Sequence, residues 1–200
     1  MDDKKVKADP GLPKDEIAPA DPHVLALLHK AGIQAIPIAL NSNYLNVILN
    51  ASSYKSSQCV ALNSISKNIA WLSARNISID DTTAYFIGSL NHLIKLDLSQ
   101  STLNDTTIQK LMSLSNLRSL NLNSTEVTEQ GLTHLSGLKS LQSIYLYQSK
   151  VNKAAFSALQ NSFPDVKIDT GNYIVPMFPG DTSEYTYEQL AKDKKAKVVQ

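Results

Sequence analysis

Three consecutive segments of this chain follow one 24-residue repeat, and this repeat constrains the fold more than any other feature of the sequence. The segments begin at Leu93, Leu117 and Leu141. When they are aligned, apolar residues occupy the same positions in each. The shared positions hold Leu96, Leu120 and Ile144; Leu98, Leu122 and Leu146; Leu103, Val127 and Val151; Ile108, Leu132 and Phe156; and Leu111, Leu135 and Leu159.

The same frame extends toward the N-terminus. A unit that begins at Ile69 places Leu72, Ala74, Ile79, Ala84, Ile87 and Leu90 in the apolar positions. A looser unit from Tyr44, with one extra residue, places Val47, Leu49, Tyr54, Cys59, Leu62 and Ile65 there. Such irregularity is expected of the terminal unit of an array.

Within each unit the spacing of apolar residues changes from two to about 3.6, which predicts a short strand, a turn and a helix. The pattern LxxLxL followed by a helical spacing is typical of leucine-rich repeats. We therefore predict an α/β fold, a leucine-rich-repeat solenoid of about five repeats of 24–25 residues with a cap at each end. Strands lie about 4.8 Å apart and packed helices about 8 to 10 Å apart, so the parallel sheet should line the concave side and the helices the convex side.

Both ends of the array carry features of caps. Asp21 and Pro22 are typical of an N-cap and a first helical residue, and they predict a helix that stops near Gly32. The strand that follows contains Pro37, which should place it at a sheet edge because proline cannot donate to the ladder. At the other end, Val166 begins a sixth, incomplete strand.

These features divide the chain into four parts. We predict a disordered linker over residues 1–20, an N-terminal cap of helix and edge strand over 21–43, leucine-rich repeats over 44–168, and a C-terminal cap with a lysine-rich tail over 169–200. Within the last part, we expect the apolar run from Tyr173 to Phe178 to cover the end of the array and the lysines beyond it to remain disordered.

Charge and hydropathy exclude several classes of partner. The 19 Lys and Arg residues nearly balance the 18 Asp and Glu residues, giving a formal net charge of +1, so we expect no nucleic-acid partner. No apolar run approaches the roughly 18 residues of a membrane span, so no direct membrane insertion is expected. The N-terminal residues are charged and proline-containing and show no signal peptide. The chain is then either cytoplasmic or a piece of a longer exported protein, and we expect a monomer.

A family resemblance bears on that choice. The segment AGIQAIPIALNSNYLNV at 31–47, the repeats of form LxxLxLxxT and the closing FPDVKIDTGNY resemble a bacterial leucine-rich-repeat domain of the type found C-terminal to a planctomycete-type c-type cytochrome domain. The resemblance covers roughly residues 21–175. It implies a periplasmic or cell-surface location, with a cytoplasmic location as the alternative. The chain contains no CxxCH, so any redox role would belong to a separate domain.

Few residues suggest catalysis or metal binding, and we predict no cofactor, no metal site and no catalytic residue. Cys59 occupies an apolar helix position, which favours a buried structural thiol. The four histidines show no metal-ligand spacing. Asp80 and Asn104 precede helices and are more simply helix caps than calcium ligands. Ser101, Thr125 and Ser149 share the position usually held by asparagine, which predicts hydroxyls bonded to turn backbone rather than nucleophiles.

The concave face is the candidate binding surface. It consists of the residues that flank the strand leucines, and the candidate contacts are Trp71, Arg75, Lys95, Asp97, Asn121, Asn123, Tyr145 and Tyr147. Serines at 73, 99, 119 and 143 lie between them. Trp, Tyr and Arg are common anchors of interfaces. The alternative is that the tyrosines are covered by the C-terminal tail and that Trp71 packs under the N-terminal cap.

We therefore predict a non-enzymatic recognition or scaffold domain that binds a protein or a cell-envelope polymer on its concave face, as part of a larger exported, cytochrome-linked protein. Two alternatives remain open: an architectural spacer without a specific ligand, and a cytoplasmic repeat protein that docks another protein. A hydrolase lacks any clustered acid, base or nucleophile in the sequence.

Overall fold

A seven-stranded, mostly parallel sheet runs through the structure, and its strand order follows the chain from β1 to β7. The structure is a computed structural model that describes residues 11–13, 15–171, 174–176 and 184–186. The strands of the sheet are β1 (Gln34–Pro37), β2 (Leu45–Ile48), β3 (Ile69–Ser73), β4 (Lys95–Asp97), β5 (Ser119–Asn121), β6 (Ser143–Tyr145) and β7 (Lys167–Asp169).

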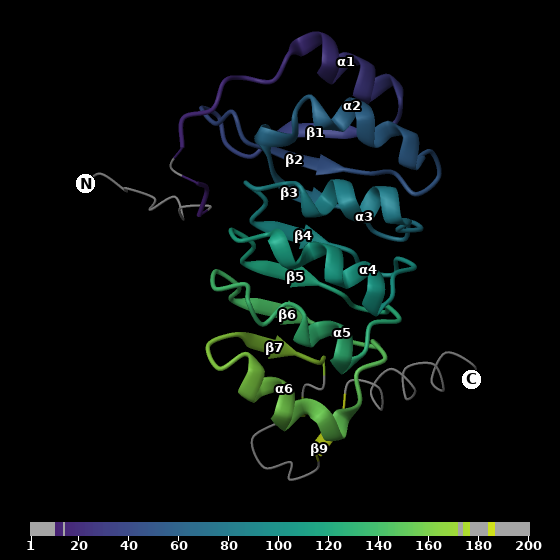
Figure 1. The fold of residues 1–200 in the computed structure, drawn as a ribbon, viewed down its shortest axis with the longest axis vertical. Coiled ribbons are helices and arrows are strands. Elements are labelled where there is room, and N and C mark those ends of the chain that lie inside the picture. Colours follow the sequence, from purple (N-terminus) through teal and green to yellow (C-terminus); the bar gives the residue numbers. More distant parts are fainter. Residues whose placement is uncertain (1–10, 14, 172–173, 177–183, 187–200) are drawn as a thin grey trace.

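A helix or helical turn lies between most consecutive strands. The α-helices are α1 (Pro22–Lys30), α2 (Cys59–Asn63), α3 (Asp81–Gly88), α4 (Asp105–Gln109), α5 (Glu129–Thr133) and α6 (Phe156–Ser162). Short 3-10 turns are η1 (Ser56–Gln58), η2 (Ser66–Asn68), η3 (Lys110–Ser113) and η4 (Lys153–Ala155). Figure 1 shows the strands stacked in order from the α1 end to the α6 end, with the helices stacked alongside them.

The register of the parallel strands confirms the repeat read from the sequence. Leu72 of β3 pairs with Leu96, Leu96 with Leu120, Leu120 with Ile144, and Ile144 with Ile168, so each step is 24 residues. The strand leucines share one core with helix residues such as Ile87, Leu111 and Leu132. Each unit thus buries its apolar side only because the next unit covers it.

Helix caps occupy the positions that the sequence indicates. The Asp80 carboxylate accepts a hydrogen bond from the Thr83 backbone N–H at 2.8 Å and begins α3. The Asn104 side chain accepts from the Thr107 N–H at 3.1 Å and begins α4. Both residues satisfy an amide that the first helical turn leaves without a partner.

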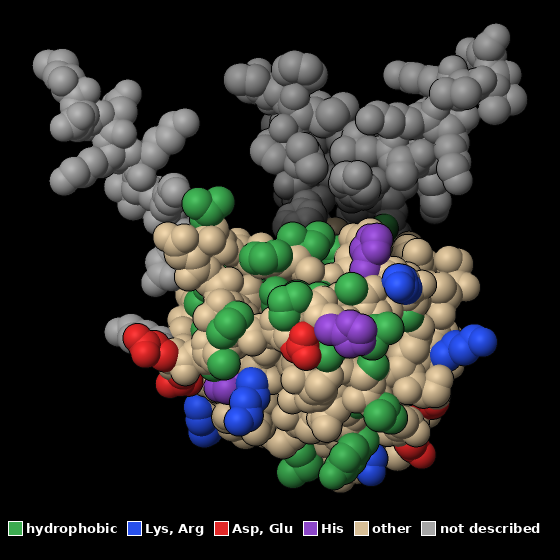
Figure 2. All heavy atoms as spheres, turned by 90° about the horizontal axis from the view of Figure 1, so that it is seen from above, with side chains coloured by type: hydrophobic (Ala, Val, Ile, Leu, Met, Phe, Trp, Pro, Cys, Tyr) green, Lys and Arg blue, Asp and Glu red, His purple; other side chains and the backbone are tan. Residues whose placement is uncertain are grey.

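The helix and the edge strand predicted before the first repeat are both present. Asp21 caps α1, Pro22 is its first residue, and β1 pairs antiparallel with β2 at the edge of the sheet, with Pro37 at the end of β1. The cap leaves some apolar side chains in solvent, among them Leu40 at 99% exposure. Figure 2 looks down on this end and shows separate hydrophobic patches among backbone and other side chains, with charged and histidine side chains scattered between them.

Four residues, spaced 24 positions apart, adopt left-handed backbone conformations. The sequence did not lead us to predict these conformations. Asn76, Gln100, Ser124 and Gln148 have φ between 55° and 60°. None is glycine, although glycine is the residue that tolerates this region without strain. The backbone N–H groups of Asn76, Gln100 and Ser124 donate to carbonyls of the next repeat at 2.7–2.9 Å, so the turns themselves link the repeats.

Residues 11–13 and 15–20 belong to the segment predicted as a disordered linker, yet they lie against the repeats. The Asn68 side chain donates to the Ala18 carbonyl at 2.8 Å, and His92 Nε2 lies 3.6 Å from Asp15 Oδ2. A side chain at Gly11 would collide with the Arg118 guanidinium. Because these partners precede β3, β4 and β5, this N-terminal strap crosses successive repeats at the amino ends of their strands, as Figure 1 shows.

The C-terminal part is described only in pieces. β7 continues the sheet as the sequence predicts for the incomplete strand. Beyond it, β8 (Ile174–Pro176) pairs antiparallel with β9 (Glu184–Thr186) in a separate sheet. The other residues of the apolar run from Tyr173 to Phe178, and the lysine-rich tail, lie outside the described residues.

Candidate functional site

The side chains that alternate with the core leucines of β3 to β6 lie on the sheet face away from the helices, which we call the open sheet face. Register places Trp71, Lys95, Ser119 and Ser143 in one row and Ser73, Asp97, Asn121 and Tyr145 in the next. Every residue of these rows except the exposed Lys95 is partly buried, whereas the intervening leucines are fully buried. This is the face that the sequence predicts to be concave.

A depression of about 250 Å³ hollows the open sheet face. Its lining brings together five of the predicted contact residues, namely Trp71, Lys95, Asp97, Asn121 and Tyr145. The lining does not include Arg75, Asn123 or Tyr147. It does include Asn46 of β2, which our prediction omitted. Alternation with the buried Val47 was the signal that could have placed Asn46 on this face.

Trp71 is less available than an interface anchor should be. The Lys95 ammonium lies 4.1 Å from the centroid of the Trp71 ring, a cation–π contact that covers the ring. Trp71 also packs against a small apolar cluster of Tyr44, Ala70 and Ile94, to which Leu12 and Ile17 of the strap contribute. The indole Nε1 is buried without a hydrogen-bond partner among the described residues. Ile38 of the predicted N-terminal cap packs on the same cluster, so Trp71 shares an apolar cluster with that cap.

Asp97 has a partner at each carboxylate oxygen. Its Oδ1 accepts from the Ser99 backbone N–H at 3.0 Å, and its Oδ2 lies 3.8 Å from Arg75 Nε. The Arg75 side chain is 59% exposed and that of Asp97 30%, so this ion pair is screened by solvent. Asp97 is therefore mainly a turn residue whose charge Arg75 partly offsets.

The two asparagines use their oxygens in the same way. Asn121 Oδ1 accepts from the Asn123 N–H at 3.0 Å, and Asn123 Oδ1 accepts from the Tyr147 N–H at 2.8 Å. Tyr147 packs against the backbone of Gly171, where an added Cβ would collide with its ring. Tyr145, in contrast, lines the depression.

Cys59 lies far from this face, in a polar pocket inside the core. The thiol is 5% exposed, and its Sγ lies 3.1 Å from Tyr54 Oη, which in turn lies 2.9 Å from Thr83 Oγ1. Burial raises the pKa of Cys59 above its ordinary value, as it does for Tyr54. Hydrogen bonds with Thr83 lower the pKa of Asp80. A buried, protonated thiol of this kind is structural, as the sequence predicts.

The predicted hydroxyl positions divide into two kinds. Ser101 Oγ donates to the Ala74 carbonyl of the preceding repeat at 2.6 Å, and Thr125 Oγ1 donates to the Leu122 carbonyl at 2.7 Å. Both residues are buried. Ser149 is only partly buried, and its side chain forms no hydrogen bond with a described residue. Two of the three positions therefore bond turn backbone.

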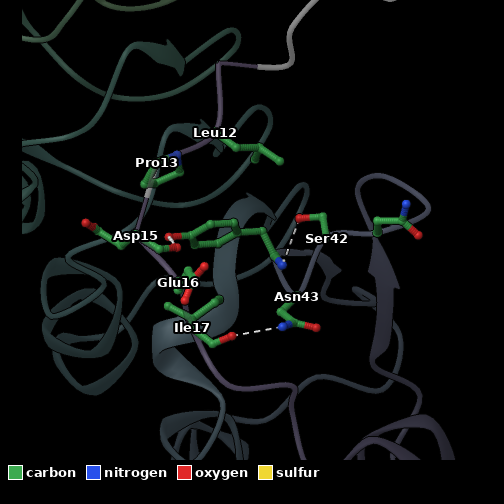
Figure 3. Close-up of a pocket in the computed structure, with 9 residues that line it drawn as sticks. Leu12, Pro13, Asp15, Glu16, Ile17, Ser42 and Asn43 are labelled. Atoms are coloured by element: carbon green, nitrogen blue, oxygen red, sulfur yellow. Dashed lines mark hydrogen bonds between the residues drawn. The ribbon is translucent and has the colours of Figure 1, made fainter.

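A second hollow, of about 510 Å³, lies between the strap and the loop before β2. Figure 3 shows a hydrogen bond from the loop to the strap, in which Asn43 Nδ2 donates to the Ile17 carbonyl at 2.8 Å. Within the loop itself, the Tyr44 N–H donates to Ser42 Oγ at 3.1 Å. Tyr44 Oη donates to the Asp15 carbonyl at 3.3 Å. The lining consists of residues that fix the strap in place, so this hollow is an anchoring site within the chain.

The depression is lined by few groups that could take part in acid–base chemistry. Asp97 is the carboxylate among its described lining residues, both of its oxygens have partners, and the lining contains no histidine or cysteine. Among the described lining residues, no hydrogen bond joins a serine hydroxyl to a basic side chain. Among the described residues, no three His, Cys, Asp or Glu side chains converge as metal ligands, and no helix is long and apolar enough to cross a membrane.

Comparisons with known proteins add little to this description. No model of a known protein family matches the chain, and no curated protein matches it. Among solved structures, an internalin from Listeria monocytogenes is similar over 60% of this chain and 44% of its own length, with 14% identity and a TM-score of 0.33. The chain thus spans less than half of that internalin. At this level the similarity bears on neither the fold nor the function of the chain.

Proposed function

We propose that this chain is a leucine-rich-repeat solenoid that acts as a recognition or scaffold domain and binds its partner on the open sheet face. The observation that supports this proposal is the hollow lined by β2 to β6. There, 24-residue register places polar and aromatic side chains of successive repeats side by side, away from the helices. A row built this way can contact an extended partner at regular intervals, as repeat proteins do.

A binding role without catalysis is the simplest one for these side chains. The depression offers amides, hydroxyls and one lysine, but no acid–base pair. Partners of matching chemistry are a protein or a cell-envelope polymer. In this proposal, residues 44–168 form the repeats, 21–43 the N-terminal cap and 169–200 the C-terminal cap and tail.

The cellular context that we propose follows from the sequence resemblance alone. The domain would belong to a larger exported protein with a c-type cytochrome domain, in the periplasm or at the cell surface. Reading the coding sequence upstream of Met1 tests this context, because an in-frame CxxCH would support it. A cytoplasmic docking protein is the alternative if Met1 is a true start.

Site-specific photo-crosslinking tests the function itself. A photoreactive amino acid placed at Ser119, in the floor of the depression, should crosslink a partner in lysate or envelope fractions of the source organism. The matched control is the same group at Lys110, which is exposed on the helical side. Crosslinking from Ser119 alone supports recognition on the open sheet face. Crosslinking from Lys110 alone would move the site to the helices, and none from either position would favour the spacer.

A further inference from the structure

The repeats bind the strap as they would bind an extended peptide, through its backbone carbonyls. Tyr44 Oη donates to the Asp15 carbonyl at 3.3 Å. Asn68 Nδ2 donates to the Ala18 carbonyl at 2.8 Å. A backbone carbonyl carries no titratable proton, so it accepts these bonds equally well across the neutral pH range.

The surface beneath the strap is apolar in two repeats only. At the second position of each repeat unit, Ala70 and Ile94 are buried in the cluster on which Leu12 of the strap packs. Arg118 and Gln142 occupy the same position in the next two units, where Arg118 is partly buried and Gln142 is exposed. The edge of the repeats is therefore apolar where the strap packs on it and polar beyond.

One position at this edge departs from the rest of the array. The residue just before a repeat unit is Asn68 in one case and Asn116 in another. Asn68 Nδ2 donates to the Asn43 carbonyl at 3.0 Å, and Asn116 Nδ2 donates to the Asn91 carbonyl at 2.7 Å, in both cases 25 residues earlier. His92 occupies the same position in the unit between them and forms no such bond with a described residue. A histidine here gives up a bond between repeats, so the repeat fold alone does not account for it.

His92 instead faces the strap. Its Nε2 lies 3.6 Å from Asp15 Oδ2, and its ring centroid lies 5.9 Å from that of Tyr44 in an edge-to-face contact. The His92 side chain is 22% exposed and that of Asp15 is 70% exposed. His92 therefore contacts both the carboxylate of the strap and the tyrosine that donates to the strap backbone.

The other titratable groups around His92 do not change charge near neutral pH. Burial and the Asp15 carboxylate raise the pKa of Tyr44 above its ordinary value of 10.0, so Tyr44 keeps its proton. Glu16 lines the hollow beside Asp15, and Arg118 lies against the strap farther toward its start. Among the described residues, His92 forms an ion pair with neither of these two. Histidine gains or loses a proton between about pH 5 and pH 8.

We propose that the strap is a pH-sensitive latch, which is attached more tightly when His92 is protonated and paired with the Asp15 carboxylate than when His92 is neutral. The apolar contacts and the bonds to backbone carbonyls attach the strap in both states, and the ion pair adds to them only in the charged state. Because Asp15 is largely exposed, water screens the pair, and the equilibrium between attached and released strap should change about two- to fivefold. This inference goes beyond the recognition function proposed above and does not depend on it.

Release of the strap would change the surface beside the depression. Leu12 and Ile17 cover the cluster that Tyr44, Ala70 and Ile94 form with Trp71. Trp71 also lines the depression. The latch therefore determines whether an apolar surface next to the open sheet face is covered.

The array supplies a matched variant for the test. His92→Asn introduces the residue that the chain itself has at Asn68 and Asn116, so it removes the titratable group and keeps the chemistry of the repeat. Asp15→Asn removes the charge from an exposed side chain of the strap and leaves the backbone carbonyl in place. His134→Asn, at an exposed histidine after α5, is the control for other effects of pH.

Proteolysis of the full chain measures release. A lysine-specific endoprotease that cleaves after Lys14 must bind the neighbouring residues, including Asp15, so the cleavage rate follows the population of released strap. Each rate is divided by that of a free peptide of the same sequence at the same pH, which removes the pH dependence of the protease. In the native chain the normalised rate should rise about two- to fivefold from about pH 5.5 to about pH 8. His134→Asn should show the same rise, and neither His92→Asn nor Asp15→Asn should show it.

Each contrary outcome overturns the latch or one of its parts. Equal normalised rates at the two pH values in the native chain, or a rate equal to that of the free peptide at both, would refute the latch. A rise that persists in His92→Asn would assign the pH dependence to another group. A rise that persists in Asp15→Asn alone would refute the ion pair, and this variant keeps the test valid if His92→Asn alters the repeats. Crosslinking from Ser119 still decides the recognition function separately.

Discussion

The Asn123 side-chain oxygen accepts a hydrogen bond from the Tyr147 backbone N–H, 2.8 Å away and 24 residues later in the chain. In the equivalent turns of other repeats, the hydrogen bond forms inside the turn itself. There, a side-chain oxygen accepts from the backbone N–H two residues later, as in Asp97, Asn121 and Asp169. Tyr145 occupies that position in its own repeat and has no such acceptor. Asn123 of the preceding repeat closes the turn instead, so this contact joins two repeats on the open sheet face.

Asn123→Ala should therefore destabilise the chain although it lies outside the core. The Tyr147 N–H loses its acceptor in a partly buried place, which should cost about 1 to 2 kcal/mol of unfolding free energy. Urea unfolding measures the loss. Asn123→Asp is the matched control, because it keeps an acceptor and should retain most of the stability. Equal losses for the two variants would show that the bond is unimportant.

Leu120→Ala tests the repeat core. Leu120 is 0% exposed and pairs with Leu96 and Ile144 in the middle of the sheet. The cavity left behind should cost about 2 to 5 kcal/mol. Lys110→Ala removes an exposed side chain and should change stability by less than about 0.5 kcal/mol. Similar melting temperatures for the two variants would contradict the repeat register that places Leu120 in the core and Lys110 on the surface.

Gln100→Gly should stabilise the chain. Gln100 is exposed and has φ 60°, a conformation that costs a residue with a Cβ about 1 to 2 kcal/mol. Glycine also has more conformational entropy in the unfolded chain, which offsets part of the strain removed. The net increase in unfolding free energy should therefore be up to about 1 kcal/mol. Gln100→Val should be destabilising, because β-branched residues fit this region poorly. Chemical denaturation should show that the unfolding free energy rises in Gln100→Gly and falls in Gln100→Val. A change in the same direction for both variants would show that the Gln100 backbone is not strained.

The fluorescence of Trp71 tests whether the strap stays packed against the repeats when the protein is in solution. It is the one tryptophan of the chain and packs on a cluster that includes Leu12 and Ile17. Removal of residues 1–20 should expose the indole, shift its fluorescence emission to longer wavelength and lower the melting temperature. Removal of residues 1–10 alone should leave the emission unchanged. Identical emission spectra for the two truncated chains would show that the strap does not shield the Trp71 indole from water.

Stability should fall at alkaline pH because of the Cys59 pocket. Burial raises the pKa of the Cys59 thiol above its ordinary value of 9.0. Below pH 9.0 the thiol is protonated in both states and its contribution is fully present; above it, the unfolded chain releases the proton while the folded chain retains it. The unfolding free energy should therefore decrease as the pH rises above that value.

Two measurements isolate this contribution. Cys59→Ala should reduce the slope of unfolding free energy against pH, leaving the share due to Tyr54, whose pKa burial also raises. In the native chain, thiol reagents should react with Cys59 far more slowly than after denaturation. A native thiol that reacts as fast as the denatured one would refute the burial.

Local sequence was sufficient wherever a residue's role depends on its neighbours in the chain. Spacing alone placed Leu72, Leu96 and Leu120 in one paired row, because a repeat of fixed length must present its apolar side at the same height each time. Asp80 and Asn104 were recognisable as caps for the same reason, since a cap bonds an amide three residues away. Pro37 marked an edge strand through its missing N–H.

Tertiary structure decided what depends on residues distant in sequence. Nothing near Asp15 predicts its approach to His92. The 24-residue spacing places Lys95 beside Trp71, but only the structure shows that the Lys95 ammonium lies over the Trp71 ring. The alternation rule placed Asn121 on the open sheet face, but only the turn geometry showed that its oxygen is committed and its Nδ2 is free. A repeat fixes which face a side chain occupies, whereas hydrogen bonds formed on that face determine which of its atoms remain available to a partner.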